Sequence, residues 1–464
     1  MKKLLAFSAI ITVLSTGCRK IEMDGASTDK PGGGNETENA ILEGRISENR
    51  TLEAGTTYKL RGLVYVTNGA TLTIEPGTKI VGESSQKGGL IITRNAKISA
   101  EGTAEKPIVF TSEAATPQRG DWAGIVILGN APTNTSFNGQ VGVGEVEGGI
   151  NNSEGLGLYG NGSSSNPADN SGILKFVRIE YAGYAFLPDK EINGLTLAGV
   201  GNQTIIDHVQ VSYSNDDAFE FFGGTVNATH LIAFHTLDDD FDTDNGFSGK
   251  IQFGIVVRDS SVADVSKVEA FESDNDANGS AATPQTSVVF SNMTVIGPKA
   301  EMSNVGNNLF LAGAQIRRNS SMSLFNSLIM GWPTGLLIDA SKGTPTDLNI
   351  PGSLLVQNTI IAGCTTPVKY TSSTTSPTGA TTATITDWFN TAAYGNSILA
   401  NNADVGLAAA FNYAAPDFNP TPGSPAAAGA SFADAKLTSG FTSVAYKGAC
   451  APGDTWWKGW TKFQ

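Results

Sequence analysis

The chain contains few cysteines and histidines, and fewer basic than acidic residues. Three cysteines and three histidines in 464 residues exclude a disulfide-rich scaffold and argue against a zinc or iron centre built from clustered Cys and His. The 30 basic and 44 acidic residues give a formal net charge of −14. Because nucleic acids and anionic lipid surfaces recruit Lys and Arg, this charge argues against both partners. A bridge between Cys364 and Cys450 is chemically allowed outside the cytoplasm and stays open.

No apolar run in the chain is long enough to cross a bilayer. The run from Leu4 to Leu14 follows Lys2 and Lys3 and leads to a Gly-Cys pair ending at Cys18. It is too short for a spanning helix, which needs about twenty apolar residues, and it predicts a secretion signal. The Gly-Cys ending resembles a bacterial lipobox, although Ser15 stands where such signals more often have Leu. Cys18 is then the predicted lipidation site, and an ordinary cleaved signal is the alternative.

These features predict four segments. Residues 1–17 form the signal peptide, and residues 18–39, which include Pro31-Gly32-Gly33-Gly34, form a flexible, lipid-anchored tether. Residues 40–415 form the folded body, and residues 416–464, with several Pro and three Trp, are expected to cap its final coil. Several acyl chains would anchor the body stably to a membrane.

The body has the pattern of a repeat fold made of strands and turns. Gly is abundant at 54 residues, and short β-branched runs alternate with Thr, Ser and Asn. One strand can be aligned over seven coils at spacings of 22 to 39 residues. The aligned strands begin at Phe176, His208, His230, Phe253, Asn292, Asn326 and Asn358. A β-sandwich also uses short strands but does not explain this alignment. The sequence therefore predicts an all-β, right-handed parallel β-helix with loop insertions.

Several motifs also resemble a known family. The opening motifs are Gly69–Thr78, Ala100–Ser112 and Gly120–Ile125, and the closing ones are Tyr446–Cys450 and Trp456–Trp460. Together they resemble right-handed parallel β-helix surface lipoproteins of Bacteroidota, over nearly the whole body. The resemblance implies the fold and a lipid-anchored location on the outer membrane, at the cell surface, and no agreed chemistry. Because many members occur among nutrient-uptake proteins, it also implies a place beside an outer-membrane transporter.

An acidic pattern repeats in register on three coils. The pattern Asp-Asp-x-Phe-acid recurs at an offset of 22, with a third copy around Phe271. In-register residues of parallel coils lie about 4.8 Å apart. If the three phenylalanines point inward, Glu220, Asp242 and Glu272 point outward in one column, with Asp244 in the next. The candidate metal ligands are Asp216, Asp217, Glu220, Asp239, Asp240, Asp242, Asp244, Glu272, Asp274 and Asp276.

Stacked carboxylates repel one another, so something must offset them. Each pair costs about 3 to 4 kcal/mol at an effective dielectric constant near 20. Ca²⁺ suits such a site because it accepts six to eight oxygen ligands in loose geometry. The alternatives are a solvated acidic face and a site for a basic or sugar ligand.

A second column lies five residues past the aligned strand starts. Tyr181, Tyr213, His235 and Arg258 occupy it on successive coils and are candidates for binding a sugar ring or an anion. Strand alternation instead places the tyrosines on the buried side, as an aromatic ladder in the core, where Arg258 fits poorly.

Two functions compete. The first is a non-catalytic binding or accessory protein for a glycan, a peptide or a partner protein, with a Ca²⁺-stabilised acidic flank. The alternative is a pectate-lyase-like polysaccharide lyase or a glycoside hydrolase. A lyase needs a base facing the acidic residues, and the near candidates in the aligned coils are Lys250 and Arg258. The excursions Pro132–Gly172 and Ser260–Thr286 are the expected binding loops.

Overall fold

The computed structural model describes residues 40–187, 190–298 and 307–464. The predicted signal peptide, Cys18 and the predicted tether all lie outside the described residues. The chain separates into two units, residues 1–37 and residues 38–464. The description below concerns the second unit alone.

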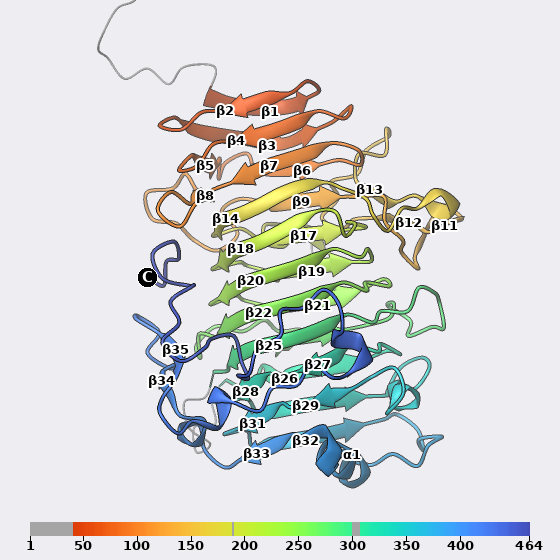
Figure 1. Ribbon diagram of the computed structural model, residues 1–464. Helices are drawn as coiled ribbons and strands as arrows, with labels where there is room; N and C mark the ends of the chain where they lie inside the picture. Colours follow the sequence, from red (N-terminus) through yellow and green to blue (C-terminus); the bar gives the residue numbers. More distant parts are fainter. Residues whose placement is uncertain (1–39, 188–189, 299–306) are drawn as a thin grey trace, which may run out of the picture. The chain divides into compact units, whose positions relative to one another are not determined.

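The body is a right-handed parallel β-helix, as predicted, in which each coil adds strands to three stacks (Figure 1). The first stack contains β2 (Arg50–Leu52), β4 (Thr71–Ile74), β7 (Lys97–Glu101), the first halves of β14 (Gly172–Glu180), β18 (Ile205–Ser212), β20 (Asn227–Phe234), β22 (Lys250–Val257) and β25 (Val289–Ile296), then β27 (Ser323–Phe325) and β30 (Val356–Gln357).

The second stack continues each coil after a corner. It contains the first half of β3 (Thr57–Val66), β5 (Lys79–Gly82), β8 (Ile108–Ser112), the second halves of the five bent strands, then β28 (Leu328–Met330), β31 (Ile360–Ala362) and β33 (Ser397–Leu399). At the amino-terminal end, β1 (Ile41–Ile46) pairs with β3.

The third stack carries the phenylalanine positions of the acidic repeat. It contains the second half of β3, β6 (Gly89–Ile92), β9 (Gly124–Leu128), β17 (Leu195–Ala198), β19 (Phe219–Phe222), β21 (Phe241–Asp244), β24 (Phe271–Ser273), β26 (Phe310–Arg317), β29 (Thr334–Asp339) and β32 (Thr366–Thr371). The short β23 (Val268–Glu269) also pairs with β26.

The loops add a few short elements. Antiparallel pairs join β10 (Ser136–Phe137) to β11 (Gln140–Val141), β12 (Val143–Glu145) to β13 (Leu158–Gly160), β15 (Ala185–Leu187) to β16 (Lys190–Glu191), and β34 (Leu407–Ala409) to β35 (Asp417–Pro420). The α-helix is α1 (Thr382–Phe389), and 3-10 helices occur at Gly162–Ser164, Thr346–Asn349, Ala392–Tyr394, Asn402–Val405, Pro425–Ala427 and Ala435–Leu437. No described helix has the length and apolar character needed to span a membrane.

The corner between the first and second stacks, called the first corner, is formed by residues in the left-handed backbone region. All seven aligned strand starts adopt a positive φ, between +49° and +63°. Asn enters this region at lower cost than most residues, which accounts for Asn292, Asn326 and Asn358 at equivalent corners. The bend lets one strand such as β18 serve two stacks.

Aromatic and aliphatic side chains fill the interior of the coil. Phe219, Phe241 and Phe271 are fully buried, and their rings stack at centroid distances of 5.2 and 5.6 Å. The predicted inward direction of these three residues is therefore confirmed. Cys364 and Cys450 are both buried, and no disulfide joins them.

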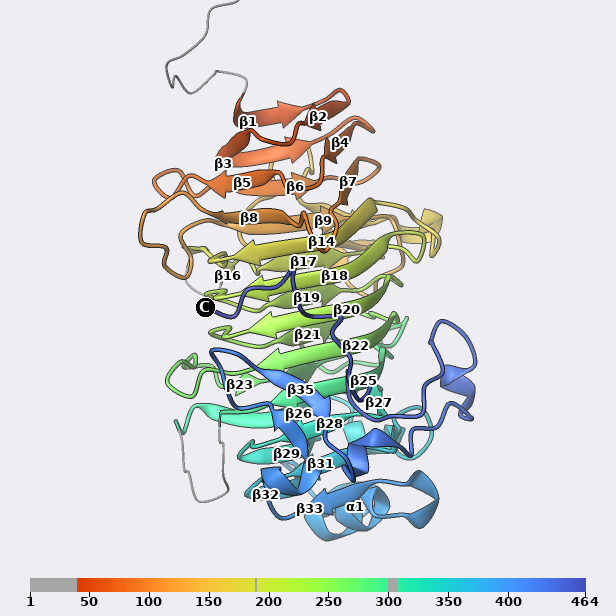
Figure 2. The ribbon, with the colours of Figure 1, turned by 60° about the vertical axis from the view of Figure 1, so that its left-hand side comes forward.

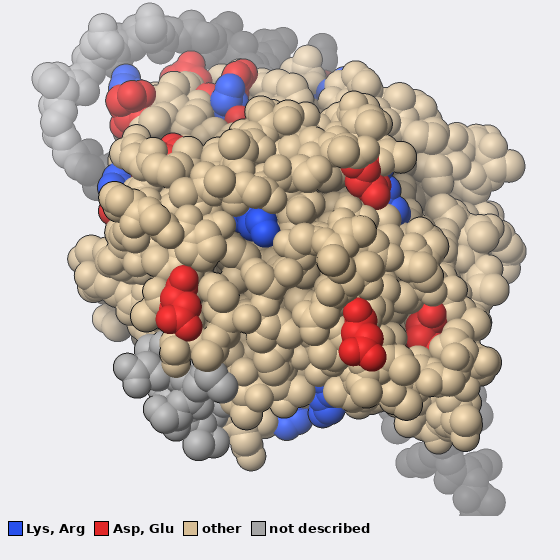
Figure 3. All heavy atoms as spheres, turned by 60° about the horizontal axis from the view of Figure 1, so that its bottom comes forward, with Lys and Arg blue, Asp and Glu red and all other residues tan. Residues whose placement is uncertain are grey.

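The carboxy-terminal strap, residues 416–464, runs back along the first corner (Figures 1 and 2). Hydrogen bonds join Thr442 to Gln252 and Lys462 to Gln210, from coils that lie well before the last one. The expected position over the final coil is taken instead by α1, whose Ile385 and Phe389 belong to the core. The end of the body that faces forward in Figure 3 carries only scattered charged side chains.

Candidate functional site

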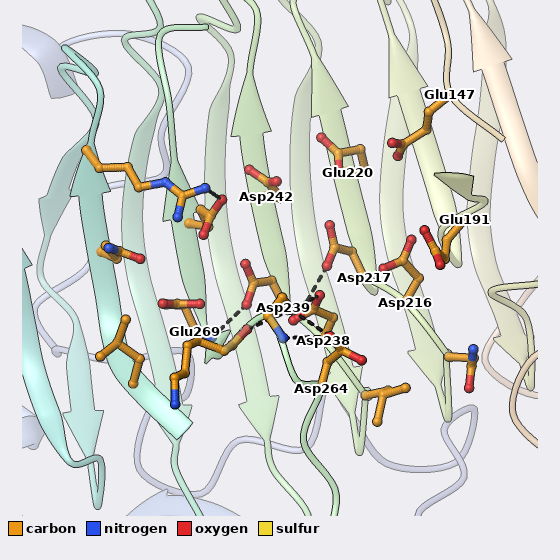
Figure 4. A pocket seen from close by; sticks show the side chains of 18 residues that line it. Glu147, Glu191, Asp216, Asp217, Glu220, Asp238, Asp239, Asp242, Asp264 and Glu269 are labelled. Carbon is orange, nitrogen blue, oxygen red and sulfur yellow. Dashed lines mark hydrogen bonds and ion pairs between the residues drawn. The ribbon is translucent and has the colours of Figure 1, made fainter. Parts of the chain in front are cut away.

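A cavity of about 510 Å³ lies beside the outer face of β19, β21 and β24. Eleven of its lining residues are carboxylates, and two, Lys267 and Arg317, are cationic. We call it the acidic cleft (Figure 4). Its carboxylates are Glu147, Glu191, Asp216, Asp217, Glu220, Asp238, Asp239, Asp242, Asp264, Glu269 and Glu272.

Two rows of acids arise from the repeat. In the strand row, Glu220, Asp242 and Glu272 lie in register on β19, β21 and β24, each directly after an inward-pointing phenylalanine. Strand alternation turns these three side chains away from the core, as the sequence predicted. Glu220 and Asp242 lie side by side in Figure 4.

The turn row comes two residues before the same phenylalanines and is held by hydrogen bonds between coils. The Asn193 Oδ1 atom accepts from the main-chain N–H of Asp217 at 3.2 Å. Asp217 Oδ1 accepts from the N–H of Asp239 at 2.8 Å, and Asp239 Oδ1 accepts from the N–H of Glu269 at 2.6 Å. Asp217 and Asp239 each thereby hold the turn of the next coil, and both side chains line the cleft (Figure 4).

The strand row contains buried oxygens without a donor. Glu220 is 3 % exposed, and its Oε1 atom accepts no hydrogen bond from any described residue. The buried Oδ1 atom of Asp242 likewise has no donor in the described part of the chain. Unpaired buried polar atoms are rare in folded proteins because desolvation is costly. A ligand carrying positive charge would satisfy both atoms.

The spacing of the oxygens suits a hard divalent cation. Three groups of carboxylates have oxygens that lie within 4.8 Å of one another. The groups are Asp216, Asp217 and Asp238; Asp217, Glu220 and Asp242; and Asp239, Asp242 and Glu272. Ca²⁺ binds oxygens at about 2.3–2.6 Å, so one ion can span two oxygens about 4.8 Å apart. The donor set, all oxygen and mostly carboxylate, fits Ca²⁺ and does not fit zinc.

Burial changes the protonation of the cleft. Removal from solvent raises the pKa values of Glu147 and Asp238 to about 7. Burial, together with the charge of Glu272, raises the pKa of Asp242 well above its usual value. Burial, together with the charge of Asp242, likewise raises the pKa of Glu220 well above its usual value. Without a cation, part of the cleft therefore holds protons near neutrality.

The protein supplies its own cation at one end of the strand row. Arg317 forms ion pairs with Glu272 and with Asp274, the second at 2.9 Å. Arg318 also pairs with Asp274. Lys267 Nζ donates to the carbonyl oxygen of Asn308 at 3.2 Å. Positive charge thus lies near Glu272, and none of these ion pairs involves Glu220 or Asp242.

A family model described as a pectate-lyase-like β-helix domain matches residues 44–405. The chain belongs to this pectate-lyase-like β-helix family. Searches of curated proteins and of solved structures found no match. The matched range contains every carboxylate of the acidic cleft. Because one fold hosts many unrelated functions, membership establishes the architecture, and the function must be argued from the cleft.

The pectate-lyase-like coil brings six of the ten predicted metal ligands together at the cleft. These are Asp216, Asp217, Glu220, Asp239, Asp242 and Glu272. The other four lie outside its lining. Asp240 pairs with Arg258, and Asp274 pairs with Arg317 and Arg318. Asp244 accepts from the N–H of Asn245, and Asp276 accepts from Asn278 and Ser280 in its own loop.

Five cleft carboxylates were absent from the predicted set. Asp238 and Glu269 occupy coil positions equivalent to Asp216 and Asp239, so the register itself contained the signal that finds them. Glu147, Glu191 and Asp264 come from loops between the coils. No spacing rule places a loop residue against a strand, and these three are found only in the structure.

The second predicted column forms a ladder at the surface. The Tyr181 and Tyr213 rings stack at 5.0 Å, and His235 meets Tyr213 edge to face. The expected position in the core is wrong, because all three residues have positive φ, which interrupts strand alternation and leaves them half-exposed. Burial lowers the pKa of His235 to about 4, so its ring is neutral at pH 7. Arg258, the fourth member, is fully buried and does not join them.

The bases considered for a lyase lie away from the cleft lining. Lys250 donates to the carbonyl oxygen of Ser439 in the carboxy-terminal strap. Arg258 is buried against Asp240. The cationic side chains that do line the cleft are Lys267 and Arg317.

A second group of metal-ligand type lies at the first corner. The Nδ1 atoms of His208 and His230 lie 2.7 and 2.9 Å from the same oxygen of Asp207. Burial opposes ionisation of Asp207, but the hydrogen bonds from the two histidines outweigh it and lower its pKa. The two imidazoles stack at 4.2 Å with 19° between their planes. Because both Nδ1 atoms are directed at one carboxylate oxygen as hydrogen-bond donors, the group is explained as part of the corner stack.

Proposed function

We propose that this pectate-lyase-like β-helix protein is a non-catalytic binding protein whose acidic cleft takes up Ca²⁺. The observation that carries the proposal is the pair of buried acceptors, Glu220 Oε1 and Asp242 Oδ1, for which no described residue supplies a donor. Carboxylates that repel one another are stabilised when a divalent cation lies between them. The ion would fix the turns of neighbouring coils and hold the flanking loops in place.

The proposal extends to the place of the protein in the cell. The lipobox-like ending at Cys18 supports a lipid anchor, and the resemblance to surface lipoproteins supports display on the outer membrane. In that setting the β-helix would bind a glycan, a peptide or a partner protein, such as a nutrient transporter. The prediction for Cys18→Ala is loss of metabolic labelling with a fatty acid and release of the protein from the membrane fraction.

Thermal melting tests the cation directly. We expect the full chain to melt at a higher temperature in Ca²⁺ than in a chelator, since an ion that binds only the folded state stabilises it by about 2.7 kcal/mol at a hundred times its dissociation constant. Mg²⁺ should give a smaller shift because it dehydrates reluctantly and prefers a strict octahedral geometry. An unchanged midpoint on adding and removing Ca²⁺ would refute the proposed calcium site.

A polysaccharide lyase remains the second candidate because Lys267 and Arg317 line the same cleft. A lyase needs a base near a cation-bound uronate. Lys267 is the candidate base, because the burial of Arg317 is outweighed by its ion pairs with Glu272 and Asp274, which raise the pKa of Arg317 and keep its guanidinium group protonated. Incubation of the protein with acidic polysaccharides in Ca²⁺ separates the two functions. Binding without release of unsaturated ends supports the non-catalytic protein. Release that Lys267→Met or Arg317→Met abolishes supports the enzyme.

A further inference from the structure

The acidic cleft has room for more than one ion along the strand row. Two of its carboxylate groups share a member: Asp242 belongs both with Asp217 and Glu220 and with Asp239 and Glu272. The shared residue lies on β21, and its neighbours in register lie on β19 and β24. A carboxylate has two oxygens with about four lone-pair sites, so Asp242 can serve a ligand on each side.

We infer that the cleft holds two divalent cations of the Ca²⁺ class, in adjacent coils, with Asp242 bridging them. This inference rests on the proposed function and specifies its stoichiometry. The inner position is Asp217, Glu220 and Asp242, and the outer position is Asp239, Asp242 and Glu272. The two positions should differ in their affinity for an ion, because different groups surround them.

The inner position should bind its ion more tightly than the outer position. Glu220 is almost completely buried, and its Oε1 atom lacks a donor within the described chain. Its Oε2 atom accepts a long hydrogen bond of 3.5 Å from Asn193. None of the carboxylates of the inner position forms an ion pair in the described residues.

The outer position competes with a resident cation. Arg317 pairs with Glu272, one of the three carboxylates of this position. Its guanidinium group already neutralises the negative charge of Glu272, which an ion would otherwise do. The outer ion should therefore bind more weakly than the inner one. No further ion is expected beyond Glu272, where Arg317 supplies the positive charge.

The third carboxylate group shares a member with the inner position. The Ser266 Oγ atom lies 2.9 Å from Asp238 Oδ2 and 2.7 Å from Asp264 Oδ2, and the buried Asp238 Oδ1 atom has no donor in the described residues. Asp217 belongs to this group and to the inner position, and one of its oxygens already accepts from Asp239 N–H. The inference therefore counts two ions and assigns none to this group.

Calorimetric titration of the chelator-treated full chain with Ca²⁺ tests the inference. We expect two ions per chain, bound in two steps. Asp242→Asn should weaken both steps by more than about tenfold, whereas Glu220→Gln should weaken only the first. Arg317→Gln should leave the first step unchanged and tighten the second. Asp387→Asn and Glu105→Gln, at exposed positions outside the cleft, serve as matched controls.

Loss of binding cannot be mistaken for misfolding in these variants. Asn and Gln keep the shape of the acids and remove a repelling charge, so the variants should melt no lower than the parent in chelator. One bound ion per chain, or an Asp242→Asn protein that loses only one step, would overturn the two-ion inference and leave Ca²⁺ binding intact. No bound ion at all would overturn the proposed function as well.

Discussion

Arg258 and Asp240 form an ion pair that solvent does not reach. Both side chains are 0 % exposed, with a nitrogen to oxygen distance of 2.9 Å. The guanidinium also donates to the carbonyl oxygens of Asp238 at 2.7 Å and of Leu237 at 3.3 Å. Asp238 and Asp239 of the same turn face the acidic cleft. Arg258 therefore positions the turn from behind while the acids in front remain available to an ion.

Arg258→Met should destabilise the fold by about 3–5 kcal/mol, because it leaves the Asp240 carboxylate buried without its partner. The double variant Arg258→Met with Asp240→Leu should recover most of this loss, since the uncompensated charge is then gone. Denaturant unfolding of the two single variants and the double variant measures the coupling. Independent, additive losses would show that the pair does not hold the turn.

The turn also shows where residue-level prediction stops. Strand alternation correctly placed Glu220, Asp242 and Glu272 outside the core, because each follows a phenylalanine within a regular strand. Asp240 precedes β21 and lies in a turn, where alternation does not hold. It points to Arg258, and Asp238, three residues before Phe241, takes the place at the cleft. The register between coils could have added Asp238 to the predicted cleft ligands. Only the geometry of the turn removes Asp240 from them.

The carboxy-terminal strap is fastened by side-chain amides that imitate a neighbouring strand. Gln210 Nε2 donates to the carbonyl oxygen of Lys462 at 2.7 Å, and its Oε1 accepts from the N–H of the same residue at 2.9 Å. Gln252 makes the same pair of bonds with Thr442, at 2.7 and 2.8 Å. The strap therefore needs no strand pairing of its own at these two points.

Gln210→Ala should free the end of the strap without loosening the coils. Each of the two lost hydrogen bonds contributes about 0.5–1.5 kcal/mol, and the effect is confined to the residues near Lys462. Hydrogen exchange should accelerate for residues 460–464 and stay unchanged in β18 and β20. Gln203→Ala, at an exposed position, is the matched control. Equal acceleration in the coils would contradict this local role.

The sequence predicted the strap as a cap over the final coil. Trp457 and Trp460, two of its three Trp, are buried. The direction of the strap depends on Gln210 and Gln252, polar residues whose partners lie about 190 or more positions away. No local pattern links such positions, so the sequence could not show that the segment runs backward along the first corner.

For the whole molecule, the acidic cleft ties stability to both pH and Ca²⁺. Burial first, and neighbouring acids second, raise the pKa values of cleft carboxyls such as Glu147. A carboxyl with a raised folded-state pKa contributes stability that is present below its unfolded pKa and is lost as the pH rises through the folded value. The folded protein without Ca²⁺ holds these protons, whereas the unfolded chain has released them.

In chelator, the melting temperature should therefore fall as the pH rises from about 4 to about 7. The lower limit is the unfolded carboxyl pKa near 4, and the upper limit is the folded pKa of about 7 for Glu147, Asp238 and Glu272. Saturating Ca²⁺ should flatten the decline, because the ion binds the deprotonated carboxylates and replaces the protons. Calorimetric scans at several pH values measure both curves. The double variant Glu220→Gln with Asp242→Asn should show a less steep decline in chelator, because two carboxyls with raised pKa values are gone while Glu147, Asp238 and Glu272 remain. If the melting temperature in chelator rises over this range, the pKa values of the cleft acids are not raised in the folded protein, and the prediction is wrong.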